Sequence, residues 1–393
     1  MSERMKRIVV LGSTGSVGIN TLEVVARYPR KFRVIGLTAY GNLSLLEKQV
    51  RRFSPSTVAV KPEGIETFRR KFKRRGLKVV SSEHDLSQIV TLKEVDIVVI
   101  AMSGSAALEP FLAAVRCGKT VAPANKEALV IAGDILIRQA RLNAARIIPV
   151  DSEQSAIFQC LEGHDRRDLK QVYLTASGGP LHRVPRSRFD TLTVEDILNH
   201  PRWKMGRKIT VDSATLLNKG FEVIEALRLF DLKVDQVHVV IHPEAIIHSM
   251  VCFRDGSILA QLGIPDMTLP IQYALTYPRR LGAGVRDVDF FQLHRMHFLK
   301  PDLKKFPCLA LAIDVARKGG TFPSVLNAAD EEAVAAFLNG EILFSHIYEI
   351  IEKVVHRHRN RSASGLKDIL AAETWARNEA GCLISRKQKK SVL

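Results

Sequence analysis

Long apolar runs are missing from this sequence of 393 residues. No uncharged stretch approaches the roughly 20 apolar residues that a membrane-spanning helix needs, so we expect no membrane-spanning segment. The chain starts with MSERMKRIVVLGSTG, in which basic residues lead directly into a strand-like run. No apolar segment with a small-residue cleavage site follows, so we also expect no signal peptide.

Cysteine is scarce, and its spacing argues against two kinds of site. The five cysteines are scattered and never form a CxxC pair: Cys117, Cys160, Cys252, Cys308 and Cys382. An odd number at such spacing argues against a disulfide framework and against a zinc site. Reduced, mostly buried thiols in a cytoplasmic protein fit this usage better.

Acidic residues are in the minority. Lysine and arginine number 58, and aspartate and glutamate 41, which gives a net charge of +17. Such a balance indicates either a phosphate-bearing partner or a solvated basic surface. Much of the excess lies in runs typical of a surface, at 69–75, 356–361 and 386–390, without the interleaved aromatic residues of a nucleic-acid site. We therefore expect neither a nucleic-acid nor a membrane partner.

Hydrophobic residues make up 46% of the chain, which is typical of folded domains. In 1–150, strand-like and helix-like segments alternate, which predicts an α/β fold with a doubly wound parallel sheet, that is, a Rossmann-like domain. Strands are expected at 7–11, 32–38, 57–60, 78–80, 95–101, 120–122 and 146–150, and helices at 19–27, 44–52, 64–74, 109–117 and 127–140.

The pattern changes after residue 150. In 151–286 strand-like segments outnumber helix-like ones, which predicts a central α+β domain. Its strands are expected at 172–176, 209–211, 236–242, 250–253 and 257–261, and its helices at 156–162 and 216–230. A linker at 287–300 leads to 301–393, where helical periodicity without strands predicts a C-terminal helical bundle with a frayed tail at 386–393.

The first motif with chemical meaning is a glycine-rich turn. Gly12, Gly15 and Gly18 follow an expected strand and open an expected helix, a context in which backbone N–H groups bind a pyrophosphate. An NAD site normally has a carboxylate at the end of the second strand for the ribose 2′-hydroxyl. This chain has Thr-Ala-Tyr-Gly-Asn at 38–42, which leaves room for a 2′-phosphate and favours NADP, although no arginine or lysine stands there.

Two carboxylates, Asp151 and Glu153, follow the strand expected at 146–150. If the segment stays extended, both point the same way and repel each other unless a hard cation such as Mg²⁺ or Mn²⁺ lies between them. Without a third ligand, this pattern is more often a surface turn or a helix cap.

The segment after residue 211 supplies a third carboxylate. Asp212 or Ser213 is expected to cap a helix on which Asn218, Glu222 and Glu225 share one face. Such residues are commonly a polar stripe in solvent. The rest of this helix is so apolar, however, that we expect the polar face not to lie free in water.

Glycines border the segment 178–207, which contains a single tryptophan, Trp203. This pattern predicts a mobile loop with an aromatic lid or, equally, a long disordered surface loop. His248 lies in a strand-like context, and such a histidine is usually held in a protein core by hydrogen bonds.

Taken in order, these segments resemble the 1-deoxy-D-xylulose 5-phosphate reductoisomerase family, NADPH- and metal-dependent enzymes of the non-mevalonate isoprenoid pathway. The resemblance rests on GSTGSVG at 12–18, ANKEALV at 124–130, PVDSEQSAIFQCL at 149–161, TASGGP at 175–180, the long segment 200–226, IHPEAIIHSM at 241–250 and LGIPDM at 262–267. It implies NADPH and a divalent metal (Mg²⁺, Mn²⁺ or Co²⁺) as cofactors, 1-deoxy-D-xylulose 5-phosphate as substrate, 2-C-methyl-D-erythritol 4-phosphate as product, and a homodimer.

The resemblance also implies a role for each matching residue. The metal ligands are Asp151, Glu153 and Glu222. The substrate-binding residues are Lys126, Ser152, Glu153, Ser177, His200, Ser213, Asn218, Lys219 and Glu222. The catalytic residues are Lys126, Glu153, His200, Trp203, Glu225 and His248. The cofactor-binding residues are Gly12, Ser13, Thr14, Gly15, Ser16, Val17, Gly41, Asn42, Ala124, Asn125, Glu127, Met205 and Gly206. Many members of the family carry a basic residue between Ala39 and Asn42, where this chain has Tyr40 and Gly41.

Two other functions compete with this interpretation. A semialdehyde- or homoserine-type dehydrogenase would share the cofactor domain, but it needs a catalytic cysteine or a lysine–aspartate pair in the second domain. It also leaves the segments DSE and NKGFE unexplained. A nucleic-acid-binding protein would use the charge of +17, and salt-sensitive retention of DNA without NADPH binding would favour it.

Overall fold

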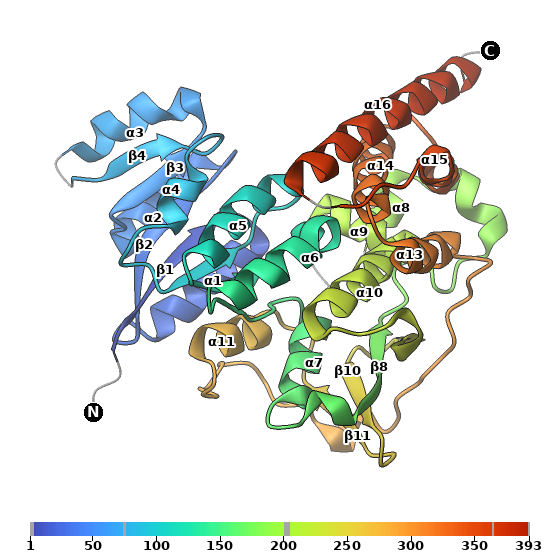
Figure 1. Cartoon of the computed structure of the whole chain (residues 1–393), viewed down its shortest axis with the longest axis horizontal. Helices are drawn as coiled ribbons and strands as arrows, with labels where there is room; N and C mark the ends of the chain where they lie inside the picture. Colours follow the sequence, from blue (N-terminus) through green and yellow to red (C-terminus); the bar gives the residue numbers. More distant parts are fainter. Residues whose placement is uncertain (1–3, 74–75, 200–204, 364, 392–393) are drawn as a thin grey trace. The chain divides into compact units, whose positions relative to one another are not determined.

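The structure, a computed structural model, describes residues 4–73, 76–199, 205–363 and 365–391 (Figure 1). Its internal contacts divide the chain into two compact units. The first unit comprises 1–128, 135–155 and 266–286, and the second comprises 129–134, 156–265 and 287–393. Most of the predicted central domain (151–286) and the predicted helical domain (301–393) fall into the same compact unit. The division into three domains therefore stays a prediction.

The first unit contains a parallel sheet of seven strands in the order β4-β3-β2-β1-β5-β6-β7. The strands are β1 (Lys6–Leu11), β2 (Phe32–Thr38), β3 (Thr57–Val60), β4 (Lys78–Ser81), β5 (Ile97–Ile100), β6 (Thr120–Pro123) and β7 (Arg146–Ile147). Their residues are mostly buried and β-branched, as expected of strands covered on both faces. The strand order reverses between β1 and β5, which is where doubly wound sheets bind ligands at the carboxyl ends of their strands. The predicted fold class is confirmed.

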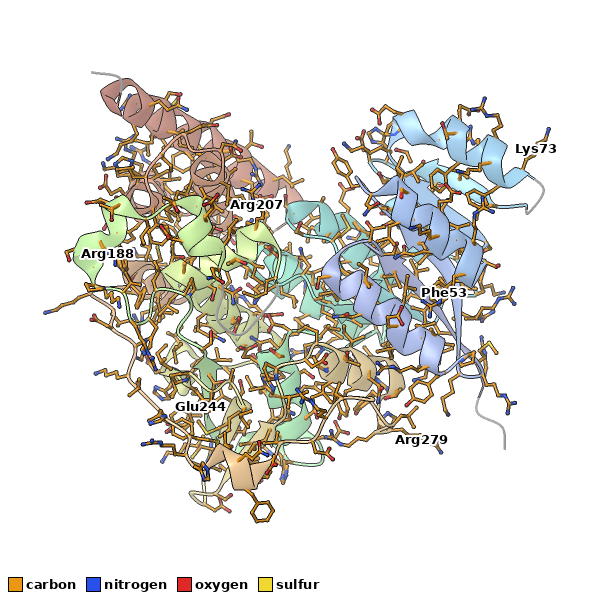
Figure 2. All side chains as sticks on the ribbon, turned by 180° about the vertical axis from the view of Figure 1, so that it is seen from behind. Phe53, Lys73, Arg188, Arg207, Glu244 and Arg279 are labelled. Carbon is orange, nitrogen blue, oxygen red and sulfur yellow. The ribbon has the colours of Figure 1, made fainter. Side chains whose placement is uncertain are left out.

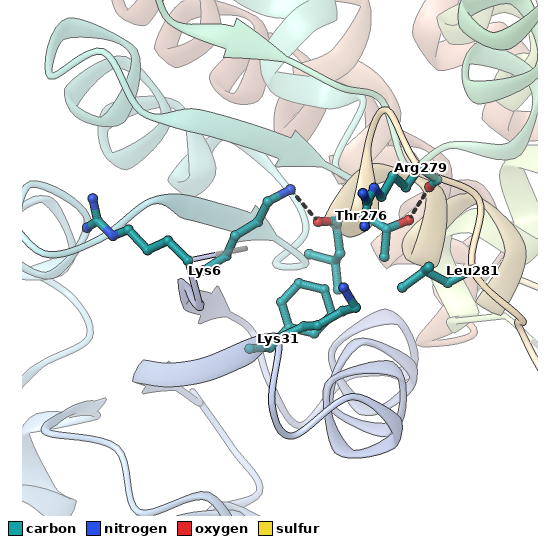
Figure 3. A pocket seen from close by; sticks show the side chains of 8 residues that line it. Lys6, Lys31, Thr276, Arg279 and Leu281 are labelled. Atoms are coloured by element: carbon teal, nitrogen blue, oxygen red, sulfur yellow. Dashed lines mark hydrogen bonds between the residues drawn. The ribbon is translucent and has the colours of Figure 1, made fainter. Parts of the chain in front are cut away.

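Helices connect these strands, and one further helix joins the unit from later in the chain. They are α1 (Ser16–Arg27), α2 (Leu43–Phe53), α3 (Ile65–Phe72), α4 (Leu86–Val90), α5 (Leu108–Arg116), α6 (Glu127–Leu142, which continues into the second unit) and α11 (Thr268–Thr276). Helix α11 packs against α1. The Nζ of Lys6 donates a hydrogen bond to the carbonyl oxygen of Leu275 (3.1 Å) in the pocket drawn in Figure 3, and a second one to the carbonyl oxygen of Tyr277 (3.3 Å). A cation at that end of α11 satisfies carbonyls that the helix leaves unpaired.

The second unit combines a four-stranded sheet with a helical bundle. The sheet has the order β11-β10-β8-β9, from β8 (Leu169–Ala176), β9 (Val237–Ile241), β10 (Ile247–Phe253) and β11 (Ile258–Leu262). The helices are α7 (Ser152–Leu161, which begins in the first unit), α8 (Val194–Leu198), α9 (Arg207–Thr215), α10 (Leu217–Phe230), α12 (Phe290–Leu293), α13 (Pro307–Lys318), α14 (Phe322–Leu338), α15 (Phe344–Arg357) and α16 (Leu366–Ser391). Helix α14 packs against α13, α15 and α16 in one apolar core, and Figure 1 shows the long α16 beside it.

Two predictions for this unit are wrong, those for 209–211 and for the tail after residue 386. Residues 209–211 form part of helix α9 and not a strand, because one face of that helix is buried in the core through Val211 and Ala214, three positions apart. The described part of the segment 178–207 contains α8, and its Leu181 and Ile197 are buried in the core; the mobility of this segment stays a prediction. The tail expected to fray continues α16 to Ser391.

The basic run at 69–75 lies on the surface, as far as the described residues show. Arg69, Arg70, Lys71 and Lys73 are exposed at the end of α3, and Figure 2 shows Lys73 extending away from the protein. This agrees with the interpretation of the run as a solvated surface. Within the described ranges, none of the helices combines the length and apolar character needed to cross a membrane.

The bundle contains a buried carboxyl group whose titration affects stability. Glu373 on α16 is 4% exposed and lies near Glu331 of α14 and near Arg377 (3.9 Å). Burial raises the pKa of Glu373 from its ordinary value of 4.5 to about 7; Arg377 opposes this shift and Glu331 adds to it. The folded protein therefore binds this proton more tightly than the unfolded chain does.

Glu373→Gln removes this titration. Because the folded-state pKa is raised, the stabilisation is fully present below about pH 4.5 and is lost as the pH rises through about 7. At 1.36 kcal/mol per pH unit, we expect the difference in unfolding free energy to move by up to about 3 kcal/mol in favour of the variant between pH 4.5 and 8. Urea unfolding at several pH values measures it, and a difference that does not vary with pH would contradict the assignment.

Candidate active site

The glycine-rich turn has the geometry of an anion site. Gly12 adopts φ +81°, and a Cβ there would lie 2.6 Å from the carbonyl oxygen of Ala101. A Cβ on Gly18 would lie 2.3 Å from the carbonyl oxygen of Gly12, so only glycine lets strand β1 turn this tightly into α1. The N-cap of α1 is Gly15, and no side chain caps this end of the helix. The N–H groups of its first turn therefore face outward for an anion.

The neighbouring strand ends complete this edge of the sheet. The Thr38 hydroxyl accepts a hydrogen bond from the N–H of Gly12 (2.8 Å), which ties the end of β2 to the turn. Ser13 is buried, and its hydroxyl donates to Gln49 Oε1 (2.7 Å), so its side chain faces the protein and not a ligand. Thr14, Gly15, Ser16 and Val17 are exposed or half-buried.

The loop at 102–104 belongs to this edge of the sheet and was not predicted from the sequence. The Nδ2 of Asn125 donates to the carbonyl oxygens of Met102 (2.8 Å) and Gly104 (3.2 Å), and its Oδ1 accepts from the N–H of Ala128 (2.9 Å). Asn125 therefore fastens the end of β5 to the start of α6, close to Ala124 and Glu127. The signal was available in the sequence: Met-Ser-Gly-Ser interrupts an apolar run directly at a strand end.

Acidic and basic groups meet after β7. Asp151 forms an ion pair with Lys126, and the two side chains are 10% and 6% exposed. The Ser152 hydroxyl donates a hydrogen bond of 2.6 Å to Glu153 Oε2. Helix α7 begins at Ser152, so 151–153 is not extended, but carboxylate oxygens of Asp151 and Glu153 still lie within 4.8 Å of each other. The two carboxylates are instead the last residue before a helix and a residue of its first turn, where the helix dipole favours negative charge.

In the second unit, two helices meet at a sharp break. Leu216 adopts φ +58° between α9 and α10. Asp212 lies inside α9 and the N-cap of α10 is Leu216, so the prediction that Asp212 or Ser213 caps this helix is wrong. On α10, Lys219, Glu222 and Glu225 are 4%, 1% and 1% exposed. The polar face is therefore buried, as predicted.

These α10 side chains contact one another. The Nδ2 of Asn218 donates to Glu222 Oε1 (2.6 Å), and Lys219 forms an ion pair with the same carboxylate. The Oδ1 of Asn218 is buried, and no described residue hydrogen-bonds to it. A buried amide oxygen of this kind is typical of a site completed by a ligand.

The turn after β8 packs against the end of α9. Gly178 and Gly179 adopt φ +91° and +68°, and a Cβ on Gly179 would lie 2.4 Å from the carbonyl oxygen of Ser213. The N–H of Gly179 donates to the Ser177 hydroxyl (3.3 Å). The structure thus brings together Ser177 and Ser213, which lie 36 positions apart.

Two histidines differ in environment. His242 is fully buried: its Nδ1 lies 2.9 Å from the carbonyl oxygen of His297, and its Nε2 accepts from the N–H of Ile246 (3.2 Å), so it is a core histidine. His248 on β10 is 6% exposed. Burial lowers the pKa of His248 to about 4, with a smaller contribution from the charge of Lys219, while hydrogen bonds to the backbone at 263 and 264 act in the opposite direction. Its imidazole is therefore neutral at physiological pH.

Two further predicted residues, Met205 and Gly206, stand at the start of α9. Gly206 is its exposed N-cap, and Met205 before it is half-buried. His200 and Trp203 lie outside the described residues.

Family models match almost the whole chain. The model for 1-deoxy-D-xylulose 5-phosphate reductoisomerase matches residues 8–133, the one for the C-terminal domain of that enzyme matches 147–230, and the one for the DXP reductoisomerase C-terminal domain matches 262–379. The chain belongs to the 1-deoxy-D-xylulose 5-phosphate reductoisomerase family.

Curated relatives and solved structures agree with this assignment. The 1-deoxy-D-xylulose 5-phosphate reductoisomerase of Thermodesulfovibrio yellowstonii is 46% identical over 96% of this chain and 98% of its own, and that of Caldanaerobacter subterraneus is 48% identical over 95% and 98%. A crystal structure of DOX-P reductoisomerase with NADPH, fosmidomycin and magnesium is 38% identical, with a TM-score of 0.92 over 97% of this chain and 98% of that one. The enzyme from Zymomonas mobilis in complex with NADPH is 38% identical, with a TM-score of 0.91 over 97% and 99%.

Membership of the reductoisomerase family confirms the resemblance and makes the chain an NADPH-dependent oxidoreductase. Both halves of the chain match reductoisomerases, so the dehydrogenase alternative is not supported. The roles of individual residues stay predictions.

Proposed function

We propose that the chain converts 1-deoxy-D-xylulose 5-phosphate to 2-C-methyl-D-erythritol 4-phosphate with NADPH and a divalent metal. The observation that carries this proposal is the buried polar face of α10, where Asn218, Lys219, Glu222 and Glu225 stand in one family-matched segment. Hydride transfer by a dehydrogenase does not in itself require a buried cluster of carboxylates, an amide and a lysine on one helix. A similar crystal structure holds NADPH, fosmidomycin and magnesium together, which supports the same cofactors here.

Asp151, Glu153 and Glu222 are the proposed metal ligands. Their donor atoms are carboxylate oxygens, which suit Mg²⁺, Mn²⁺ and similar hard cations. In the structure Asp151 pairs with Lys126 and Glu222 with Lys219, so each of these carboxylates already faces a positively charged group. When bound, the cation supplies a Lewis acid for the carbonyl and neighbouring hydroxyl oxygens of the substrate.

The substrate phosphate is proposed to bind Ser177, Ser213, Asn218 and Lys219. Hydroxyl, amide and ammonium donors are the groups that bind phosphate, and the close packing of Gly179 against Ser213 holds the turn that contains Ser177 in place before substrate arrives. Binding energy at this end, remote from the reacting carbons, holds the substrate while the chemistry takes place.

The reaction breaks and re-forms a carbon–carbon bond of an α-hydroxy ketone and then reduces the resulting aldehyde. Lys126, Ser152 and Glu225 are proposed to bind the substrate hydroxyls, and the neutral ring of His248 to pack beside the carbon chain without adding charge. His200 and Trp203 are proposed to close over the substrate and exclude water, which holds the two fragments together.

NADPH is proposed to bind along the carboxyl edge of the parallel sheet. The uncapped start of α1 fits its pyrophosphate, and the turn residues Thr14 to Val17 are accessible to it. Asn42, Ala124 and Glu127 are proposed to contact the rest of the cofactor, with Met205 and Gly206 near the nicotinamide.

We further propose a homodimer. Strand β11 is an edge strand, and its Ile258 and Leu259 are 52% and 39% exposed. Exposed edges of this kind pair with another chain, so a second copy of β11 is the proposed partner, and the mass in solution is expected to be twice that of the chain.

We also propose that the chain has three functional regions, at 1–150, 151–286 and 301–393, and that it is located in the cytoplasm.

Absorbance at the nicotinamide wavelength tests the activity directly. We expect NADPH oxidation only when 1-deoxy-D-xylulose 5-phosphate and Mg²⁺, Mn²⁺ or Co²⁺ are all present, and we expect a chelator to abolish it reversibly. Calorimetry with fosmidomycin provides a second measurement, since binding should depend on the added metal. Unchanged absorbance with all components present, or full activity after removal of the metal, would refute the proposal.

A further inference from the structure

A lysine and a tyrosine meet where the cofactor adenosine end is expected. Tyr40 follows β2 and Lys61 follows β3, and these strands are parallel neighbours, so both residues lie at the carboxyl edge of the sheet. The Nζ of Lys61 lies 3.7 Å from the centroid of the Tyr40 ring. Lys61 lies 21 positions after Tyr40 in the sequence, and only the pairing of β2 with β3 brings it to the end of β2.

The end of β2 is the place at which such sheets distinguish NADP from NAD. A 2′-phosphate there needs donors and positive charge. The Oδ1 of Asn42 accepts a hydrogen bond from the N–H of Leu45 (3.0 Å) and thereby caps α2, which leaves its amide N–H groups as donors. The start of α2 adds backbone N–H groups, but no full charge comes from residues 38–42.

Lys61 supplies that charge. No carboxylate among the described residues forms an ion pair with it, so its charge is not neutralised by an acidic neighbour. Tyr40 is 62% exposed, and its ring faces the ammonium group. A contact of this kind contributes about 0.5–1 kcal/mol at an exposed site, which orients the lysine without neutralising it.

We propose that Lys61, oriented by Tyr40, binds the 2′-phosphate of NADPH and gives this chain its preference for NADPH over NADH. The inference rests on the proposed function and assigns to the residue after β3 the positive charge that residues 38–42, at the end of β2, do not supply.

Gly41 makes a rescue experiment possible. A Cβ added at Gly41 would meet no atom within 4 Å, and the backbone there is not in the left-handed region, so a lysine fits at that position. We therefore compare the wild type, Lys61→Ala, and Lys61→Ala combined with Gly41→Lys. Lys78→Ala is the matched control, because exposed Lys78 stands at the opposite, amino end of the neighbouring strand β4 and its loss changes the net charge equally.

Binding is measured by titration with NADPH and NADH, and by calorimetry with adenosine 2′,5′-bisphosphate and AMP, without substrate or metal. We expect Lys61→Ala to bind NADPH and the bisphosphate about 10- to 100-fold more weakly, the range for a lost hydrogen bond to a charged group. NADH and AMP should bind as before. Gly41→Lys should restore most of the affinity, and Lys78→Ala should resemble the wild type.

The role of Lys61 would be overturned if Lys61→Ala lost no affinity, or lost affinity equally for NADPH and NADH. It would also be overturned if Gly41→Lys failed to restore NADPH affinity in a double variant whose thermal midpoint equals that of the wild type. These outcomes leave the proposed function intact as long as the wild type binds NADPH and turns over substrate. A wild type that binds neither cofactor would overturn both proposals together.

Discussion

Turnover by Glu222→Gln is expected to fall by at least about a hundredfold, while the affinity for NADPH stays within about twofold. Glu222 is 1% exposed, accepts a hydrogen bond from Asn218 and pairs with Lys219. Glutamine keeps the shape and the hydrogen bond but removes the charge that a divalent cation requires, and a metal centre contributes several kcal/mol to stabilising developing negative charge.

Titration with Mn²⁺ separates this effect from unfolding. The apparent activation constant for Mn²⁺ should rise as turnover falls, and a high metal concentration should restore part of the activity. Glu373→Gln is the control, since Glu373 is also a buried glutamate (4% exposed) but lies in the helical bundle. Full activity of Glu222→Gln at limiting metal would remove Glu222 from the metal site.

Lys208→Met is expected to destabilise the second unit by about 3–5 kcal/mol, the usual result of removing one partner from a buried ion pair. The Nζ of Lys208 lies 2.7 Å from Asp212 Oδ2 and 2.6 Å from Asp330 Oδ2, and these side chains are 3% and 0% exposed. The same ammonium lies 4.9 Å from the centroid of the Phe221 ring. Without the lysine, two buried carboxylates lose their shared cation.

Thermal and urea unfolding measure this change, and a fall of roughly 10 °C in the thermal midpoint corresponds to it. Lys208→Arg should lose much less, because it keeps the charge. Combining Lys208→Met with Asp330→Asn should recover part of the stability, since one of the two stranded carboxylates is then absent. A midpoint for Lys208→Met within about 2 °C of the wild type would show that the three groups do not depend on one another.

The sequence predicted the parallel sheet well because its signal is local. Apolar strands and glycine turns recur along 1–150, and each buried strand carries its own β-branched run. Residues 209–211 show where local signals fail. Their β-branched residues favour a strand, but the Lys208–Asp212 ion pair and the buried faces of Val211 and Ala214 hold them in helix α9.

The polar residues of the site were found from their spacing, but their partners were not. The burial of Glu222 followed from the apolar residues around it, whereas the pairing of Asp151 with Lys126 joins positions 25 apart through the contact of two strand ends. The Lys61–Tyr40 contact is of the same kind. Spacing along one helix is visible in a sequence, whereas contacts across a sheet edge require the strand order.

The close approach of Gly179 to the carbonyl oxygen of Ser213 also restricts how this protein can vary. A Cβ at 2.4 Å from that oxygen leaves no room for any other amino acid unless β8 and α9 separate. A substitution at Gly179 therefore cannot narrow the proposed phosphate site without first moving β8 away from α9. Changes in the size of that proposed site have to act through Ser177, Ser213 or the α10 side chains instead, which are the same groups that we propose bind the substrate.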